Sequence, residues 1–245
     1  MKKTNADFIG SLSELLSKSK IIELSHVLVE GIPTYPTHTK YFQNAWKSKG
    51  DIALMNQLVI GEHTGTHVDS PSHFPITGPY SSQSIDQVSI QQLMGRCVKI
   101  TIDPPPGLNQ MVPESAILAW EAVYGNLQPG DIVLFDLQWS NDRWNIGDAG
   151  FAFLEDWPGL SLEAARLLKN RQVSVVGTDC MSLDTGDGGG GSLPAHFELL
   201  SAGILIMENI CNLDLLPTFS FFMALPLRIA GGTGSPIRAI ALLEG

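Results

Sequence analysis

The sequence predicts an α/β fold in a single domain, with more strand than helix. Short, almost wholly apolar runs at 132–135 and 173–177 are typical of buried strands. Segments with helical spacing of apolar residues, such as 113–124 and 161–170, lie between such runs. The 24 glycines and 15 prolines among 245 residues predict many turns rather than a helical bundle. No low-complexity linker and no repeat of fixed period divides the chain.

The first part of the chain is predicted to begin with a helix and to continue mainly as strands and loops. Phe8, Leu12 and Leu15 recur at helical spacing, and Pro33 and Pro36 require a loop. In chain order we expect an amphipathic helix over 6–18, strands over 21–29 and 52–61, loops over 31–38 and 76–83, a short helix over 84–93 and a strand over 96–103.

The second part of the chain is predicted to alternate strands and helices. One helix has Pro113 near its first turn and Gly125 just past its end, and another has Ser161 as its N-cap. The expected elements are helices over 113–124, 161–170 and 195–202, strands over 131–139, 173–177, 204–208, 221–229 and 237–243, and a glycine-rich loop over 183–193. The long aromatic-bearing connection over 140–158 has a length that is often functional.

Charge and hydropathy exclude several classes of protein. The net charge is −10, and no basic run follows Lys2 and Lys3, so we expect no nucleic-acid partner and little attraction to anionic membranes. No stretch of 18 uninterrupted apolar residues predicts a membrane span, and the first residues lack the apolar core of a signal peptide. Cys97, Cys180 and Cys211 are odd in number and far apart, which favours reduced, buried thiols and a cytoplasmic location.

Three of the six histidines fall within eleven residues, at positions 63, 67 and 73, with Asp69 between the last two. Neutral imidazole and carboxylate are the usual ligands of Zn²⁺ and related ions. Gly65 permits a turn, so the segment is predicted to be a shaped loop; if 66–70 is extended, His67 and Asp69 point the same way. The alternative is a surface loop that happens to carry histidines. His26, outside this cluster, is predicted to be structural.

The run 61–74 reads Gly-Glu-His-Thr-Gly-Thr-His-Val-Asp-Ser-Pro-Ser-His-Phe. It closely resembles the signature HxGTHxDxPxHF of the cyclase-like metal hydrolases, a family that includes bacterial kynurenine formamidase and isatin hydrolase. Further similarities fall at 178–179, at His196 and over 204–209, 224–228 and 234–236. The resemblance spans 20–245 and leaves 1–19 as an N-terminal helical extension.

The resemblance implies a compact α/β domain of the swivelling β/β/α type, with a mixed sheet, flanking helices and a homodimer or higher homo-oligomer. The metal ligands that it implies are His63, His67, Asp69, His196 and Glu208. It assigns acid/base catalysis to His73 and substrate contact to Tyr35, although kynurenine formamidase has Trp at the similar place. Tyr35 packed on its neighbouring prolines is the alternative. The cofactor is one or two divalent ions, Zn²⁺ or Mn²⁺, and Asp69 is able to bridge two.

The function implied by the resemblance is hydrolysis of a C–N or C–O acyl bond, in an arylformamide, amide or similar small molecule, by metal-activated water. A ring-opening lactam or lactone hydrolase like isatin hydrolase is the first alternative; Glu208 stands where such enzymes have Gln. A metal-binding protein without catalysis is the second. No GxSxG motif suggests a serine hydrolase, and no phosphate-loop motif accompanies the glycines at 188–191.

Overall fold

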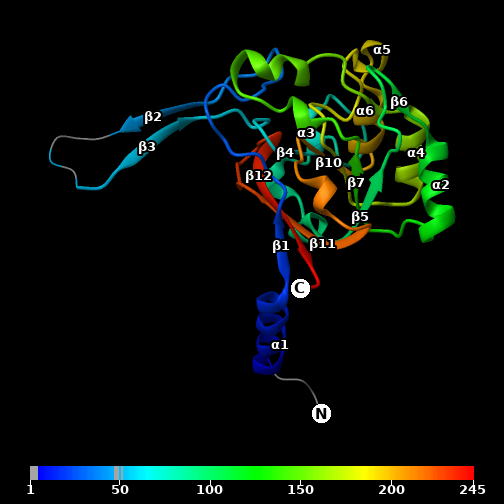
Figure 1. The fold of residues 1–245 in the computed structure, drawn as a ribbon, viewed down its shortest axis with the longest axis horizontal. Coiled ribbons are helices and arrows are strands. Elements are labelled where there is room, and N and C mark those ends of the chain that lie inside the picture. The colour runs from blue at the N-terminus through cyan, green and yellow to red at the C-terminus, as the bar shows by residue number, and fades with distance from the viewer. Residues whose placement is uncertain (1–4, 47–49, 51) are drawn as a thin grey trace.

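A mixed sheet that closes on itself organises the fold (Figure 1). The computed structural model describes residues 5–46, 50 and 52–245. The main sheet has eight strands, and an additional pairing between β12 and β4 joins seven of them into a ring. In order around the ring these are β12 (Gly234–Leu243), β11 (Phe219–Pro226), β5 (Met94–Thr101), β7 (Ile132–Asp136), β9 (Val175–Thr178), β10 (Leu205–Glu208) and β4 (His67–Asp69).

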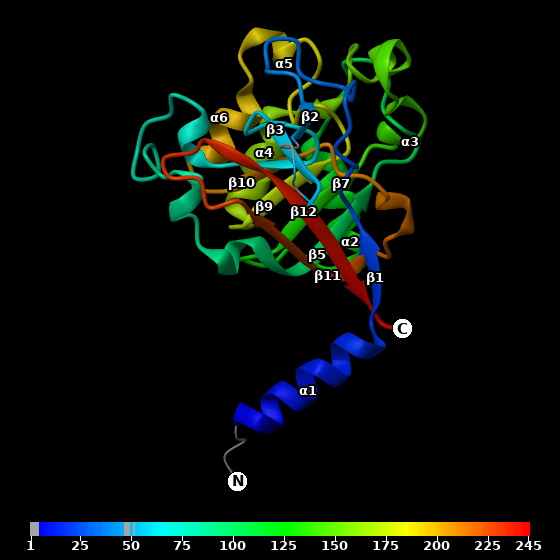
Figure 2. The same cartoon turned by 90° about the vertical axis from the view of Figure 1, so that its left-hand side faces the viewer.

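The short strand β1 (Lys20–Glu23) pairs with the far end of β12, beyond the part of β12 that pairs with β4. Strands β5, β7, β9 and β10 run parallel, whereas the other pairs in the sheet are antiparallel. The sheet is therefore mixed. Figure 2 shows β12 as a long strand that runs diagonally across the front of the sheet, with its C-terminal end beside β1.

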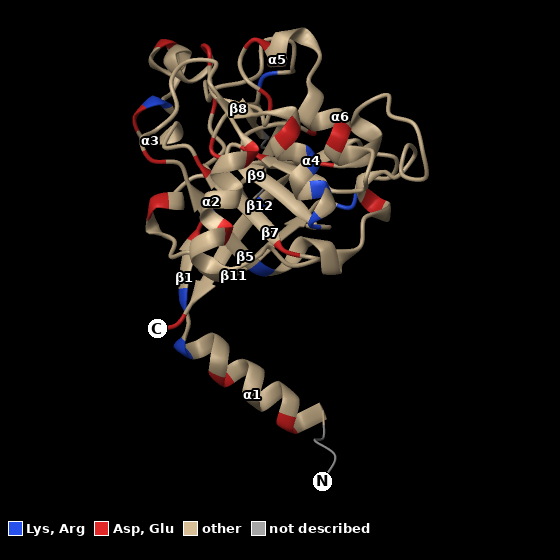
Figure 3. Cartoon of the chain, turned by 90° about the vertical axis from the view of Figure 1, so that its right-hand side faces the viewer, with Lys and Arg blue, Asp and Glu red and all other residues tan. Residues whose placement is uncertain are grey.

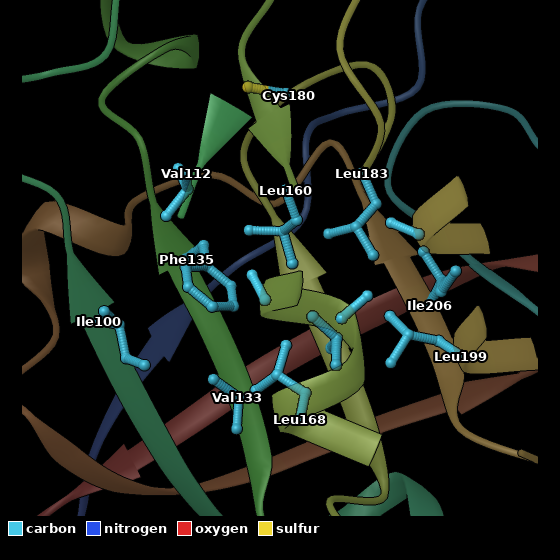
Figure 4. Packing of buried hydrophobic residues seen from close by; sticks show 14 of the residues in the cluster. Ile100, Val112, Val133, Phe135, Leu160, Leu168, Cys180, Leu183, Leu199 and Ile206 are labelled. Carbon is cyan, nitrogen blue, oxygen red and sulfur yellow. The ribbon is translucent and has the colours of Figure 1, made fainter. Parts of the chain in front are cut away.

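Helices α2 (Glu114–Tyr124), α4 (Leu162–Asn170) and α6 (Pro194–Leu200) follow successive strands of the parallel part of the sheet. They cover its outer face, because parallel strands require crossover connections. Val133 and Phe135 of β7 point to this face, where they pack with Leu168, Leu199 and Ile206 (Figure 4). Full burial of one such side chain stabilises the fold by about 1.5–3 kcal/mol.

A second core fills the opposite face of the same strands. Ile132 and Leu134 alternate along β7 with Val133 and Phe135, so they point to the opposite face. There they pack with Val175, Met207 and Phe222. Burial of both faces explains why the parallel strands are continuous apolar runs in the sequence rather than alternating ones. The predicted α/β class with more strand than helix is confirmed.

The predicted helices over 6–18, 113–124, 161–170 and 195–202 are confirmed within two residues at each end. The predicted N-cap is also present, since Ser161 Oγ accepts a hydrogen bond of 3.1 Å from Ala164 N. The helix expected over 84–93 is wrong. Two 3-10 turns, η2 (Ile85–Gln87) and η3 (Ile90–Leu93), replace it because Val88 and Ser89 have extended backbone between them.

The strand expected over 21–29 ends at Glu23. Beyond Glu23, a side chain replaces the backbone as hydrogen-bond partner of β12, since Ser25 Oγ accepts a hydrogen bond of 2.8 Å from Ala239 N. The backbone of Ser25 instead forms an isolated bridge with Ile210. The remaining elements are short. They are η1 (Pro71–His73), β6 (Met111–Val112), α3 (Ser140–Arg143), η4 (Gly147–Phe153), β8 (Gly159–Leu160), α5 (Gly188–Gly191) and η5 (Leu213–Leu215).

Two elements project from the body of the protein (Figures 1 and 2). Helix α1 (Asn5–Lys18) has no buried residue, and its apolar side chains, Leu12 and Leu15 among them, are exposed. The hairpin of β2 (Phe42–Trp46) and β3 (Met55–Val59) extends to the left in Figure 1; β2 is a strand that the sequence did not predict. The division of the chain at residue 19 stays a prediction.

Charged side chains are dispersed over the helical side of the molecule, where Lys and Arg lie among Asp and Glu (Figure 3). Helix α1 carries few charges in the same view. Among the described residues, no helix has the length and apolar character needed to cross a bilayer.

Candidate metal centre

Strand β4 carries the central part of the histidine-rich segment. It lies between β10 and β12, so that His67 is opposite Glu208 on one side and Pro236 on the other. Because side chains alternate along a strand, His67 and Asp69 share one face, and Val68 points into the core on the other face. The segment is thus not wholly a loop, and the extended geometry anticipated for 66–70 is present at its centre.

The turn at Gly65 brings His63 back to the same face. Gly65 has φ +61°, and a Cβ there would lie 2.8 Å from Leu28 Cδ2. At Gly234, on β12, a Cβ would lie 2.5 Å from His63 Cε1. Gly65 therefore permits the turn, and Gly234 leaves the space that the His63 imidazole occupies.

Five side chains, from strands β4 and β10, helix α6 and the turn at His63, converge in two overlapping groups that share Asp69. The groups are His63, His67 and Asp69, and Asp69, His196 and Glu208; within each, the potential ligand atoms lie within 4.8 Å of one another. Asp69 Oδ1 is 2.6 Å from His63 Nδ1 and 3.4 Å from His67 Nε2. Glu208 lies 3.2 Å from His196 Nε2 and 3.5 Å from His67 Nε2.

Each of the three histidines has one ring nitrogen occupied outside the group. His67 Nδ1 donates to Gly65 O at 2.8 Å, and His196 Nδ1 donates to Asp184 at 2.6 Å. His63 Nε2 donates to Thr233 Oγ1 at 3.0 Å, because that hydroxyl itself donates to Glu62. The other ring nitrogen of each histidine faces the two carboxylates, so each imidazole is oriented as in metal sites, where one nitrogen binds the ion and the other donates to a supporting group.

The electrostatics of the group require positive charge. Burial by itself would raise the pKa of Asp69, but the surrounding histidines, His63 first, hold it well below 3.8. Burial opposes protonation of His67 and His196, yet hydrogen bonds to carboxylates raise the pKa of each ring above 6.5. Asp69 Oδ2 is buried without a hydrogen-bond partner among the described residues. These nitrogen and oxygen donors fit a divalent cation.

His73 lies beside this group on a 3-10 turn. Its ring stacks on His63 with centroids 3.8 Å apart and meets Phe74 edge-on. Burial lowers the pKa of His73 to about 4, so the ring is neutral at pH 7. It belongs to neither group of potential ligands, so it is free to exchange a proton.

A cavity of about 240 Å³ opens onto these residues. Tyr35 lines it and packs edge-on against Trp157, with ring centroids 6.1 Å apart. His38, His67, His73 and His196 also line it. The predicted site residues are therefore all brought to one place, whereas His26 lies elsewhere, stacked at 3.8 Å on Trp144.

Sequence reasoning missed three contributors to the centre: His38, Asp184 and Thr233. His38 sits three residues after Tyr35 in the same proline-containing loop, which was the available signal. Asp184 follows the predicted strand over 173–177, at the end of a sheet where polar residues often form sites. Thr233 gave no signal, because its approach to His63 depends on the pairing of β12 with β4.

Comparison with known proteins gives consistent results. The Cyclase family model matches residues 22–185. Isatin hydrolase of Roseibium aggregatum is 32% identical over 210 residues, 81% of this chain and 78% of that protein. Kynurenine formamidase of Geobacillus thermodenitrificans is 27% identical over 220 residues, 89% of this chain and 95% of that protein.

A solved isatin hydrolase bound to the product analogue thioisatinate is similar over 99% of this chain and 100% of its own, with a TM-score of 0.86 and 28% identity. Isatin hydrolase A from Ralstonia solanacearum gives a TM-score of 0.84 at 26% identity, over 100% of this chain and 98% of its own. The match of the family model, the identity to curated relatives and the shared fold agree with one another. The chain belongs to the cyclase family of metal-dependent hydrolases.

Proposed function

We propose that the protein hydrolyses a C–N or C–O acyl bond of a small molecule with the help of a divalent metal. The observation that carries this proposal is the placement of the neutral His73 ring beside the five potential ligands, on the wall of one cavity. A site that only stored metal would have no use for this additional imidazole.

The ligand groups are His63, His67, Asp69, His196 and Glu208. A divalent ion bound there lowers the pKa of coordinated water and polarises a carbonyl oxygen. His73 accepts the proton that the attacking water loses and then donates it to the departing nitrogen or oxygen. The cavity, with Tyr35 and His73 on its wall, offers the carbonyl a place beside His73.

Two kinds of substrate are candidates for the molecule that contains the cleaved bond, and they are called here the two settings. Glu208, a carboxylate where isatin hydrolase-like members carry Gln, favours the arylformamide setting that kynurenine formamidase represents. Similarity to isatin hydrolases along nearly the whole chain, with a TM-score of 0.86, favours opening of a cyclic amide or ester. Both settings use the same proton transfer by His73.

We propose Zn²⁺ or Mn²⁺ as the ion, because histidine and carboxylate ligands suit both. The two ligand groups share Asp69, whose two oxygens lie near different histidines, so each group of three side chains would hold one ion. The three cysteines are buried and free, and they favour a reducing, cytoplasmic setting.

The first experiment is elemental analysis of the purified protein, combined with hydrolysis of N-formylkynurenine and isatin before and after chelation. We expect bound Zn or Mn and turnover that chelation removes and metal restores. The preferred compound would choose between the two settings. Absence of metal after reconstitution would refute the proposal, and stoichiometric metal without turnover of any acyl substrate would favour a binding protein.

We also propose a homodimer or higher homo-oligomer. Helix α1 and the β2–β3 hairpin project from the body with exposed apolar side chains, among them Leu12, Leu15 and Leu58. Apolar area on two separate projecting elements is typical of surfaces that a second copy covers.

A further inference from the structure

A second and larger cavity adjoins the metal centre. Its volume is about 660 Å³, against about 240 Å³ for the cavity that opens onto the histidines. Two segments line it, 30–42 and 147–155, and the second belongs to the long connection over 140–158. Tyr35 and His38 line both cavities. These two side chains therefore stand at the boundary between the two spaces.

The walls of the second cavity are mainly apolar. Ile32 and Tyr41 contribute from the first segment, and Phe151 and Leu154 from the second. Ile32 and Tyr41 are themselves buried, so these walls are continuous with the interior of the protein. A space with such walls favours an apolar ligand, since burial of each CH₂ group contributes about 0.8 kcal/mol.

Contacts between the two segments fix the shape of this cavity. Gly147 N donates a hydrogen bond of 2.8 Å to Gly31 O, and a Cβ at Gly150 would lie 3.1 Å from Pro33 Cγ. Behind the second segment, Trp139 Nε1 donates to Phe153 O at 3.1 Å. The cavity therefore lies between packed segments rather than between loose loops.

The second cavity offers more space for a ligand than the cavity at the metal centre does. Ligand pockets commonly measure about 300–1,000 Å³. The space at the metal centre lies below that range, and the second cavity lies within it. At the boundary His38 Nδ1 is buried without a hydrogen-bond partner among the described residues, and the Tyr35 ring stands beside it with centroids 5.0 Å apart.

We propose that the substrate has two parts: a reactive acyl group at the metal centre, and an apolar body of an aryl ring extended by several carbons in the second cavity. Tyr35 and His38 contact the junction of the two parts, with His38 hydrogen-bonded to a polar atom there. This inference rests on the proposed function for the reaction itself. It adds the class of substrate: an extended acyl-aryl compound rather than a compact one.

The first test measures binding, using the metal-loaded protein with phenol and 4-hexylphenol in calorimetry. Neither compound contains an acyl bond. We expect the hexyl compound to bind at least tenfold more tightly. Leu154→Trp, which fills the cavity, and Phe151→Ala, which removes part of its wall, should each abolish most of that difference, whereas Leu118→Trp on the exposed side of α2 should preserve it.

Phe151 is exposed on its outer side, so its truncation tests the cavity even where Leu154→Trp fails to fold. Equal affinities for phenol and 4-hexylphenol would overturn the inference. So would a loss of affinity in the cavity variants that is the same for both compounds, because a general disturbance of the fold would have that effect.

The second test compares kcat/KM for formanilide and 4-hexylformanilide, which share the reacting bond. We expect the hexyl compound to be favoured at least tenfold and Leu154→Trp to remove this preference, whereas Leu118→Trp should leave the turnover of both compounds unchanged. Hydrolysis of both compounds at equal kcat/KM would overturn the inference of a two-part substrate but leave the proposed function intact. Hydrolysis of neither, with the phenol difference intact, would support the cavity as an apolar binding site and count against the proposed function.

Discussion

Asp184 Oδ2 lies 2.6 Å from His196 Nδ1, and the same oxygen accepts a hydrogen bond from His196 N at 3.1 Å. The other oxygen accepts one from Ala195 N at 2.9 Å. Asp184 is fully buried, so its carboxylate fixes the start of helix α6, the orientation of the imidazole and its tautomer together.

Asp184→Ala should therefore weaken metal binding by about 10–100-fold, the usual effect of removing a carboxylate behind a ligating histidine. Competition with a coloured chelator measures this change. Asp214→Ala, at an exposed position in η5, is the matched control and should bind metal as the unmodified protein does. Unchanged affinity in Asp184→Ala would show that His196 does not ligate.

His73→Ala separates the acid/base group from the ligands. It should reduce kcat by about 10²–10⁴-fold, because it removes proton transfer in the transition state. The metal content should be retained, since His73 belongs to neither group of converging ligand atoms. His67→Ala should lose both metal and turnover. If His73→Ala also lost its metal, the histidine would be a ligand and the assigned role would be wrong.

Glu121 and Arg171 join helix α2 to the end of helix α4. The Glu121 carboxylate accepts two hydrogen bonds of 2.7 Å from the Arg171 guanidinium, and one of 2.9 Å from Leu127 N. The Arg171 hydrogen bond is the main cause that lowers the pKa of Glu121 below 4.5. A depressed carboxyl pKa stabilises the fold above the unfolded value, and this stabilisation is lost as pH falls through the folded value.

Glu121→Gln should accordingly lower the free energy of unfolding by about 1–3 kcal/mol at pH 7. The difference from the unmodified protein should shrink as pH falls below 4.5 and through the lowered pKa of the Glu121 carboxyl. Urea unfolding at several pH values measures it. A difference that is constant with pH would show that the ionised Glu121 carboxylate is not its source.

The exposed apolar face of α1 provides a test of association. Leu12→Glu should convert the oligomer to monomer at micromolar concentration, because a buried charge without a partner destabilises an interface. Light scattering coupled to size exclusion measures the mass. Ser17→Glu, at a position turned away from Leu12 on the same helix, should stay associated. A monomeric unmodified protein would refute the proposed homo-oligomer.

Local patterns predicted much of this structure, and long-range pairing explains what they missed. The helices over 113–124 and 161–170 and the apolar strands were predictable because spacing and end signals act within a few residues. His67 and Asp69 shared a face by the same local rule. His196 and Glu208 entered only through the family resemblance, since nothing local relates them to residue 67.

The errors have physical reasons. Strand β2 contains Gln43 and Asn44 and is exposed, so neither apolar alternation nor strand propensity marks it. The segment over 84–93 has enough apolar residues for a helix, but Ile85 N donates a hydrogen bond to Gly232 O and Gln92 Nε2 donates one to Gly203 O. These contacts hold two separate 3-10 turns with extended backbone between them. Those partners come from remote parts of the sequence.

The closure of the ring by β12 and β4 affects the order in which the protein matures. Strand β4 depends on β10 at one edge and β12 at the other, and the ribosome makes both long after His67 and Asp69. A nascent chain that lacks β12 already carries all five ligand residues, but β4 then has one unpaired edge. Contacts so distant in sequence form slowly. Metal loading of this enzyme would therefore follow release from the ribosome, and translation pauses before residue 234 would expose the ligands to the wrong ions.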